Sequence, residues 1–163
     1  TVARAVRSLS ERGAQFCTIH GNQSIMEAAA KAKSGGLKVL AVTALTSLDR
    51  GDLDDLGFQC EVGDLVLSRA RRALAAGCDG VVSSGLEVER LQAEIGGKLI
   101  CVTPGIRPVD NKLDTGDQKR VMTPAAAMRA GADYIVVGRP IRDAADPRAA
   151  AQAIQDEIQK ALG

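Results

Sequence analysis

Two arginines stand where the chain could bind an anion. Arg107 lies between Pro104 and Pro108, directly after an apolar run, so the two prolines restrict the direction of its backbone. Arg139 follows Gly138 at the end of another apolar run. A glycine lets backbone N–H groups approach an anion closely, and a guanidinium offers two parallel donors to phosphate oxygens. Each motif alone also fits a rigid surface turn that carries a solvated arginine.

A polar segment, residues 109–120, separates the two arginine motifs and contains Gly116 and Gln118. Its length and its glycine suit a mobile lid over a site, and an ordinary surface loop fits equally well. Gln118 is therefore a third candidate for ligand binding.

Short apolar runs rich in β-branched residues alternate with longer helical stretches and must position these side chains. We expect strands over residues 15–20, 38–45, 80–84, 99–103 and 134–138. Several of these runs are continuously apolar, which is typical of parallel strands covered on both faces. The residues that follow Thr1 read as the first turn of a helix, and Ala150, Ile154 and Ile158 form an apolar stripe on the last helix.

Helix boundaries carry local signals. Ser24 and Glu27 have the spacing of a capping box. Thr123 and Asp146 each precede a proline, as capping side chains do at a helix start. Glycines 13, 35, 77, 96 and 131 each follow a helical run and precede a strand.

This alternation permits an open doubly wound sheet or a (β/α)8 barrel. Five units in 163 residues give 163/5, or 33 residues each, close to the ~31 of a barrel. A five-stranded doubly wound sheet would be complete at this length, but the glycine-rich phosphate fingerprint expected after its first strand is absent. We therefore predict an α/β fold, a TIM barrel present as about five βα units, with Arg107, Gln118, Gly138 and Arg139 on one rim as a phosphate site.

Composition narrows the function. Lys plus Arg number 21 against 20 for Asp plus Glu, which gives no indication of a nucleic-acid or membrane surface. Four cysteines without a C-x-x-C pair and a single histidine exclude a zinc site of usual spacing, and reduced thiols favour a cytoplasmic protein. Asp49, Asp52, Asp54 and Asp55 lack EF-hand spacing, so we interpret them as an exposed acidic loop and expect no metal.

Three segments resemble the closing half of the orotidine 5'-phosphate decarboxylase family: residues 102–108 (VTPGIRP), 116–124 (GDQKRVMTP) and 131–141 (GADYIVVGRPI). Residues 41–47 (AVTALTS) and 18–21 (TIHG) are similar to the family's fifth and fourth strands, so the resemblance extends over the whole chain as strands four to eight.

The resemblance implies roles for individual residues. Arg139 and the Gly138 backbone would hold the 5'-phosphate of the substrate, Gln118 would bridge phosphate and pyrimidine, and Arg107 would be a further substrate contact. Thr46 and Ser47 would meet the edge of the pyrimidine.

Two other residues receive less direct roles. Thr1 matches a threonine that reaches the ribose in the partner subunit, which implies a homodimer with shared active sites. His20 resembles a residue behind the catalytic carboxylates, although a lone histidine is more often satisfied by a core hydrogen bond.

The activity implied is decarboxylation of orotidine 5'-phosphate to UMP in de novo pyrimidine biosynthesis, without a cofactor. The family's catalytic Lys/Asp network comes from its first three strands, which this chain does not contain. We therefore expect residues 1–163 to be the C-terminal part of one barrel domain, to contain no catalytic residue, and to be inactive alone. Two alternatives stay open: a related sugar-phosphate decarboxylase or aldolase, and a non-catalytic flavodoxin-like binding module.

Overall fold

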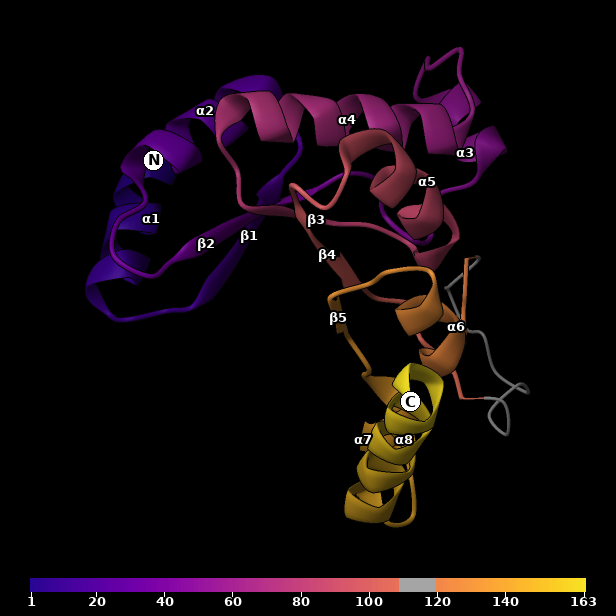
Figure 1. The fold of residues 1–163 in the computed structure, drawn as a ribbon. Helices are drawn as coiled ribbons and strands as arrows, with labels where there is room; N and C mark the ends of the chain where they lie inside the picture. Colours follow the sequence, from indigo (N-terminus) through magenta and orange to yellow (C-terminus); the bar gives the residue numbers. More distant parts are fainter. Residues whose placement is uncertain (109–119) are drawn as a thin grey trace.

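The computed structural model describes residues 1–108 and 120–163, in which helices and strands alternate (Figure 1). The helices are α1 (Val2–Glu11), α2 (Gln23–Ala32), α3 (Arg50–Asp55), α4 (Val62–Ala76), α5 (Gly85–Ile95), α6 (Pro124–Arg129), α7 (Arg139–Arg142) and α8 (Pro147–Leu162). The strands are β1 (Phe16–His20), β2 (Lys38–Val42), β3 (Gly80–Val82), β4 (Ile100–Thr103) and β5 (Tyr134–Ile135).

The strands of the described residues form one parallel sheet in the order β1-β2-β3-β4-β5. Each strand thus lies beside the strand that precedes it in the chain. A doubly wound sheet reverses its order at a switch point, whereas a barrel adds every βα unit on the same side. The sheet is curved, with helices along its outer side (Figure 1). It is therefore an arc of a (β/α)8 barrel, as expected, and the flavodoxin-like interpretation is wrong.

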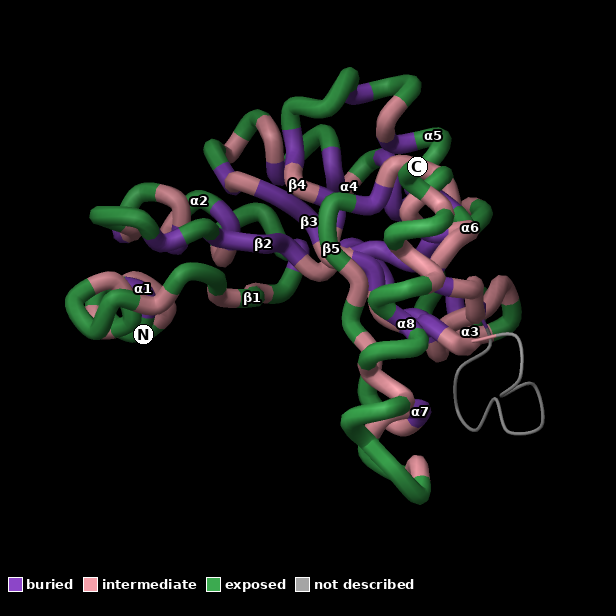
Figure 2. The backbone as a smooth tube through the Cα atoms, turned by 60° about the horizontal axis from the view of Figure 1, so that its bottom comes forward, coloured by how far each residue is buried: buried purple, intermediate pink, exposed green. Residues whose placement is uncertain are grey.

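The core lies between the sheet and its helices. Val39, Ala41, Val81 and Cys101 alternate with inner-face residues along their strands and join one buried cluster with side chains of the helices. The central strands are accordingly the most buried part of the backbone (Figure 2). Burial of this apolar layer is the main favourable contribution to folding.

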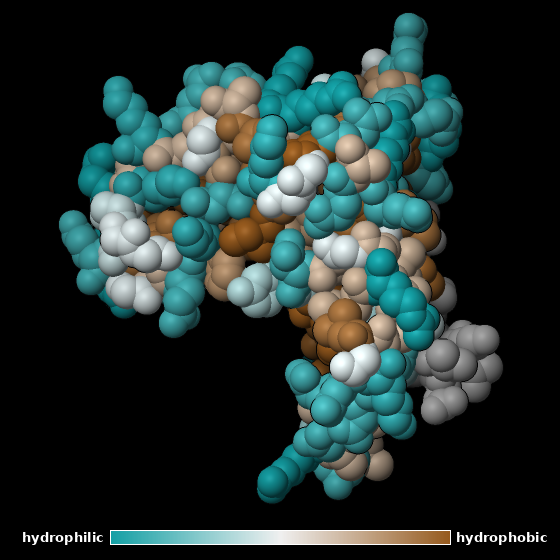
Figure 3. Space-filling model, in the orientation of Figure 1, coloured by the Kyte–Doolittle hydropathy of each residue, from teal (hydrophilic) through white to brown (hydrophobic). Residues whose placement is uncertain are grey.

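The inner face of the sheet is less covered within the described residues. Phe16 and Tyr134 are 40% and 51% exposed, and hydrophobic surface appears in the bend of the molecule (Figure 3). Their rings nevertheless meet edge to face, with centroids 5.3 Å apart. Because these residues open the first and last strands of the sheet, the contact shows how strongly the sheet curls.

Two Gly-x-Asp motifs bring the chain from a helix into a strand. Asp79 precedes β3, and its Oδ2 accepts hydrogen bonds from the Val39 N–H at 2.8 Å and from the Lys33 ammonium at 2.7 Å. Asp133 precedes β5, and its Oδ2 accepts from the Cys101 N–H at 2.8 Å. Each carboxylate thus satisfies a backbone donor of the neighbouring strand.

Most expected boundaries are confirmed. Thr123 and Asp146 cap α6 and α8 by accepting hydrogen bonds from the N–H groups of Ala126 and Ala149. The strands end earlier than expected, since β2 stops at Val42 and β5 at Ile135.

Two local interpretations are wrong. Helix α2 begins at Gln23, one residue before Ser24, so the Ser24–Glu27 capping box does not form; Glu27 instead accepts a hydrogen bond from Gln23. The acidic stretch from Asp49 to Asp55 is not a loop but the short helix α3, which begins with a capping box between Asp49 and Asp52.

Candidate functional site

Residues that follow β2, β4 and β5 line an open hollow of about 360 Å³ at the carboxyl ends of these strands. Its lining residues are Thr46, Pro104, Gly105, Arg107, Val136, Gly138, Arg139 and Arg142. Of the predicted substrate-binding residues, the structure thus brings together Thr46, Arg107, Gly138 and Arg139. Cavities of this size accommodate small ligands.

Arg107 is held by a short link between residues 105–107 and Met122. Ile106, which is fully buried, forms a parallel bridge with Met122. The Arg107 N–H donates to the Met122 carbonyl at 2.9 Å, and the Met122 N–H donates to Gly105 at 3.2 Å. The Arg107 side chain folds back so that Nη1 donates to the Ile106 carbonyl at 2.8 Å. The backbone that carries this guanidinium is therefore fixed.

Arg139 begins helix α7, with Gly138 as its N-cap. A side chain at Gly138 would meet no atom within 4 Å, so open space lies beside this backbone. Arg142 lies three residues on and lines the same hollow, as residues at i and i+3 of a helix do. The sequence interpretation missed Arg142, although this spacing was a usable signal.

The lining of the hollow includes three guanidinium groups and, in the described part of the chain, no carboxylate. Asp143 lies beside it and pairs with Arg142, with Nε–Oδ1 and Nη2–Oδ2 distances of 2.6 and 2.9 Å. This hydrogen-bonded pairing lowers the pKa of Asp143 and keeps its carboxylate charged. An anion is the ligand that suits this lining.

The remaining predicted site residues do not line the hollow. Ser47 is next to Thr46 but is not among the lining residues, and neither is the exposed Thr1 at the start of α1. Gln118 lies outside the described residues. His20 ends β1 and is exposed among the described residues.

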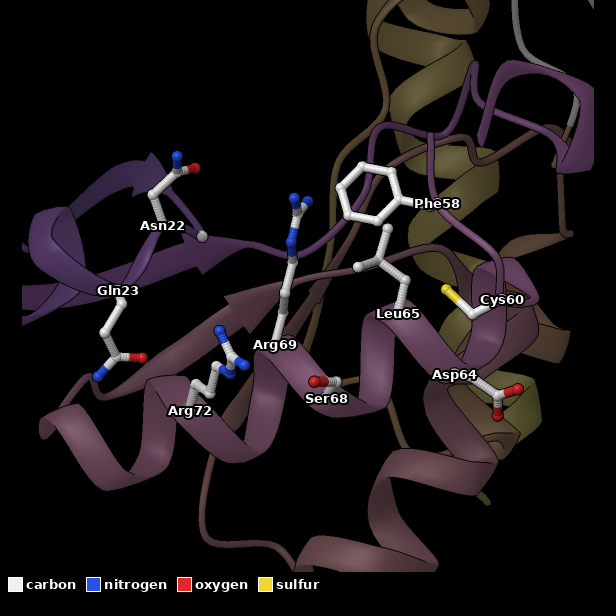
Figure 4. Close-up of a pocket in the computed structure, with 10 residues that line it drawn as sticks. Asn22, Gln23, Phe58, Cys60, Asp64, Leu65, Ser68, Arg69 and Arg72 are labelled. Atoms are coloured by element: carbon white, nitrogen blue, oxygen red, sulfur yellow. The ribbon is translucent and has the colours of Figure 1, made fainter. Parts of the chain in front are cut away.

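A larger hollow of about 590 Å³ lies where β1 ends and was not anticipated from the sequence (Figure 4). Residues of α2, of the α3–α4 connection and of α4 line it. Arg69 crosses it, donates to the Thr43 carbonyl, and has its guanidinium carbon 5.8 Å from the centre of the Phe58 ring. These contacts give Arg69 a structural role at the end of β2, so the smaller hollow is the better candidate for an anion.

The described residues contain no group of three or more histidine, cysteine or acidic side chains that could hold a metal ion. They also contain no helix with the length and apolar character that crossing a membrane requires.

Named relatives are similar to this chain over almost its whole length. The model of the "Orotidine 5'-phosphate decarboxylase / HUMPS family" matches residues 1–154. An orotidine 5'-phosphate decarboxylase of Methylococcus capsulatus is 68% identical over 159 residues, which are 98% of this chain and 65% of that protein. One from Rhodopseudomonas palustris (strain HaA2) is 52% identical, over 99% of this chain and 68% of that protein. The chain thus spans about two thirds of the length of these curated relatives.

Solved structures agree in fold. The orotidine 5'-phosphate decarboxylase from Lactobacillus acidophilus superposes with a TM-score of 0.79 at 35% identity, over 96% of this chain and 69% of that chain. The enzyme of the same name from Pyrococcus horikoshii gives a TM-score of 0.66 at 26% identity, over 97% of this chain and 67% of that chain. The order of the strands, the arginine-lined rim and these similarities agree: the chain belongs to the orotidine 5'-phosphate decarboxylase / HUMPS family.

Proposed function

We propose that the full-length protein decarboxylates orotidine 5'-phosphate to UMP and that this chain supplies the grip on the phosphate. In this proposal residues 1–163 are the C-terminal part of a single (β/α)8 barrel. Its first three strands, with the Lys/Asp network that the family uses for chemistry, belong to preceding residues. The half-exposed inner face of the sheet, including Phe16 and Tyr134, supports this division because further strands would cover it.

The observation that carries the proposal is the convergence of Arg107, Arg139 and Arg142 on one hollow without a carboxylate in its described lining. Guanidinium groups bind phosphate oxygens in pairs of parallel hydrogen bonds. Thr46 is a buried polar residue of the same lining, and its hydroxyl suits the edge of a pyrimidine. Ser47 and Gln118 complete the substrate contacts that we propose.

A phosphate grip contributes to catalysis although it is remote from the bond that breaks. In the proposed reaction the C6–carboxylate bond breaks, CO2 leaves, and a proton is added at C6. Contacts between Arg139 and the phosphate raise the turnover rate to the extent that they strengthen as this transition state forms. The arginines would thus bind and orient the nucleotide while residues outside this chain deliver the proton.

The proposal has four further parts. Thr1 reaches the ribose in a partner subunit, so the protein is a homodimer with shared active sites. His20, at the end of β1, stands behind the catalytic carboxylates. The reaction uses no cofactor, and the enzyme acts in the cytoplasm.

The test is an assay of the purified full-length protein with orotidine 5'-phosphate, following loss of the orotate absorbance with and without a chelator. We expect turnover that the chelator does not change. An open-chain sugar phosphate with Mg²⁺ is the matched alternative substrate. Turnover of that compound and none of the nucleotide would contradict the proposal in favour of a sugar-phosphate enzyme.

Binding measurements test the phosphate grip separately. We expect UMP to bind about 100-fold more tightly than uridine, since several charged contacts depend on the phosphate. Equal affinities for the two compounds would contradict the assignment of a phosphate site to this hollow.

A further inference from the structure

A buried ion pair lies beside the link that holds Arg107. Glu87 is in the first turn of α5, and Arg120 lies two residues before Met122 in the chain. Arg120 Nη1 lies 2.5 Å from Glu87 Oε1, and the two side chains are 9% and 11% exposed. Among the described residues, most other ion pairs are much more accessible; in Arg71–Glu94, for example, the side chains are 59% and 40% exposed.

This pair is only partly satisfied. Glu87 Oε2 and the Nε and Nη2 atoms of Arg120 are buried and have no hydrogen-bond partner within residues 1–108 and 120–163. Burial raises the pKa of Glu87 even though the Arg120 charge acts in the opposite direction. A buried pair with unpaired atoms is a poor source of stability, because the loss of hydration is not fully compensated. The pair is therefore better explained by what it holds in place than by the stability it adds.

The pair connects the Arg107 link to the body of the fold. Arg120 lies two residues before Met122, whose carbonyl accepts the Arg107 N–H. Met122 also packs against the start of α5, because a side chain at Gly85 would come within 2.8 Å of the Met122 sulfur. Helix α5 is itself anchored in the core by Val88 and Leu91.

We propose that Glu87 and Arg120 position Arg107 at the hollow. The ion pair fixes the chain at Arg120 against α5, the adjoining residue Met122 aligns the backbone of Arg107, and the guanidinium then meets the phosphate in one orientation. Arg120 and Glu87 are positioning residues in this scheme and do not touch the substrate. The inference rests on the phosphate site of the proposed function.

The experiment compares three variants of the full-length protein: Arg120→Met, Glu87→Leu and the double variant. Each single variant leaves a charged partner buried, so it lowers the melting temperature whatever the role of the pair. The double variant removes both charges and keeps the volume, which is often neutral or stabilising. The exposed pair provides the matched control, Arg71→Met with Glu94→Leu.

The readout is kcat/KM for orotidine 5'-phosphate and for orotidine, which lacks the phosphate. For the double variant we expect a recovered melting temperature, a loss of about 10- to 100-fold for the nucleotide, and no change for the nucleoside. The control pair should change neither. A double variant that recovers nucleotide activity together with its melting temperature would overturn the inference, as would equal losses for both substrates.

The same variants separate this inference from the proposed function. If the parent protein binds UMP but turns over no orotidine 5'-phosphate, the proposed reaction fails. The UMP affinity then tests the ion pair: a weaker affinity in the double variant, with unchanged uridine affinity, supports positioning, and an unchanged UMP affinity refutes it.

Discussion

The two ends of the sheet are built differently. At the amino ends of the strands, Asp79 and Asp133 accept hydrogen bonds from backbone N–H groups of neighbouring strands. At the carboxyl ends, arginines gather around an open hollow, and the buried hydroxyls of Ser83 and Thr103 have no hydrogen-bond partner in the part of the chain that the structure describes. Carboxylates thus join neighbouring strands at the amino ends, whereas guanidinium groups surround an open hollow at the carboxyl ends. In barrels, ligands bind at the second kind of end.

Of the substitutions that distinguish the amino from the carboxyl end of the sheet, Arg139→Ala should have the largest effect on activity. Arg139→Ala in the full-length protein should reduce kcat/KM for orotidine 5'-phosphate roughly 30- to 150-fold, the equivalent of about 2–3 kcal/mol for a charged hydrogen-bonded partner. The melting temperature should stay within about a degree, because Arg139 is not part of the core. Arg148→Ala, an exposed arginine of α8 outside the hollow, is the control. Loss of activity in both variants, or in neither, would contradict a specific role of Arg139 in substrate binding.

The opposite pattern is expected at Asp79. Asp79→Asn removes the charge that pairs with Lys33 at 2.7 Å, and the free energy of unfolding should fall by about 1–3 kcal/mol at neutral pH. Denaturant titration measures this loss, and kcat/KM should be unchanged. A variant that keeps its stability but loses activity would show that the amino end also serves the site.

The effect of Asp79→Asn should depend on pH. Burial alone would raise the pKa of Asp79, but the hydrogen bonds from Lys33 and Val39 and the charge of Lys38 together lower it below its ordinary value. A lowered pKa stabilises the folded state above the pKa of the unfolded chain, and this contribution is lost as the pH falls through the folded value. The difference between parent and variant should therefore shrink below about pH 4. A constant difference down to pH 2 would contradict the pairing.

The smallest expected effect concerns the thiols next to the two aspartates. Burial, ahead of any neighbouring charge, raises the pKa of Cys78 and of Cys101 to about 11. Both thiols should react slowly with an aromatic disulfide reagent at neutral pH, because the thiolate is the nucleophile. The partly exposed Cys60 should react first. Mass spectrometry of the labelled peptides checks this order, and early labelling of Cys101 would show that the amino end opens readily.

The sequence predicted the fold because its apolar runs are short, β-branched and separated by helix signals that act locally. The caps at Thr123 and Asp146 are confirmed because they depend only on adjacent residues. The acidic helix α3 was missed because it has six residues and little apolar periodicity. The strand ends were overestimated because residues such as Thr43 keep strand-like sequence after the ladder has ended.

The sequence predicted only those site residues that directly follow a predicted strand. Thr46, Arg107, Gly138 and Arg139 follow apolar runs, so the shared rim of a parallel sheet brings them together. The Glu87–Arg120 pair could not be predicted from the sequence, because its members are 33 positions apart and only the tertiary fold brings them together. Sequence patterns report local geometry, and contacts between distant segments need coordinates.

The simple order of the strands has a consequence for protein engineering. Within the described residues each strand pairs only with its chain neighbours, so an exchange of the segment from β5 to α8 interrupts one pairing of this sheet, that of β4 with β5. In a closed barrel the other edge of β5 would add a second pairing. Chimaeras with related barrels should therefore tolerate a junction between α6 and β5, from Arg129 to Tyr134, better than one inside a βα unit. Single βα units of this chain are therefore suitable segments for exchange with related barrels.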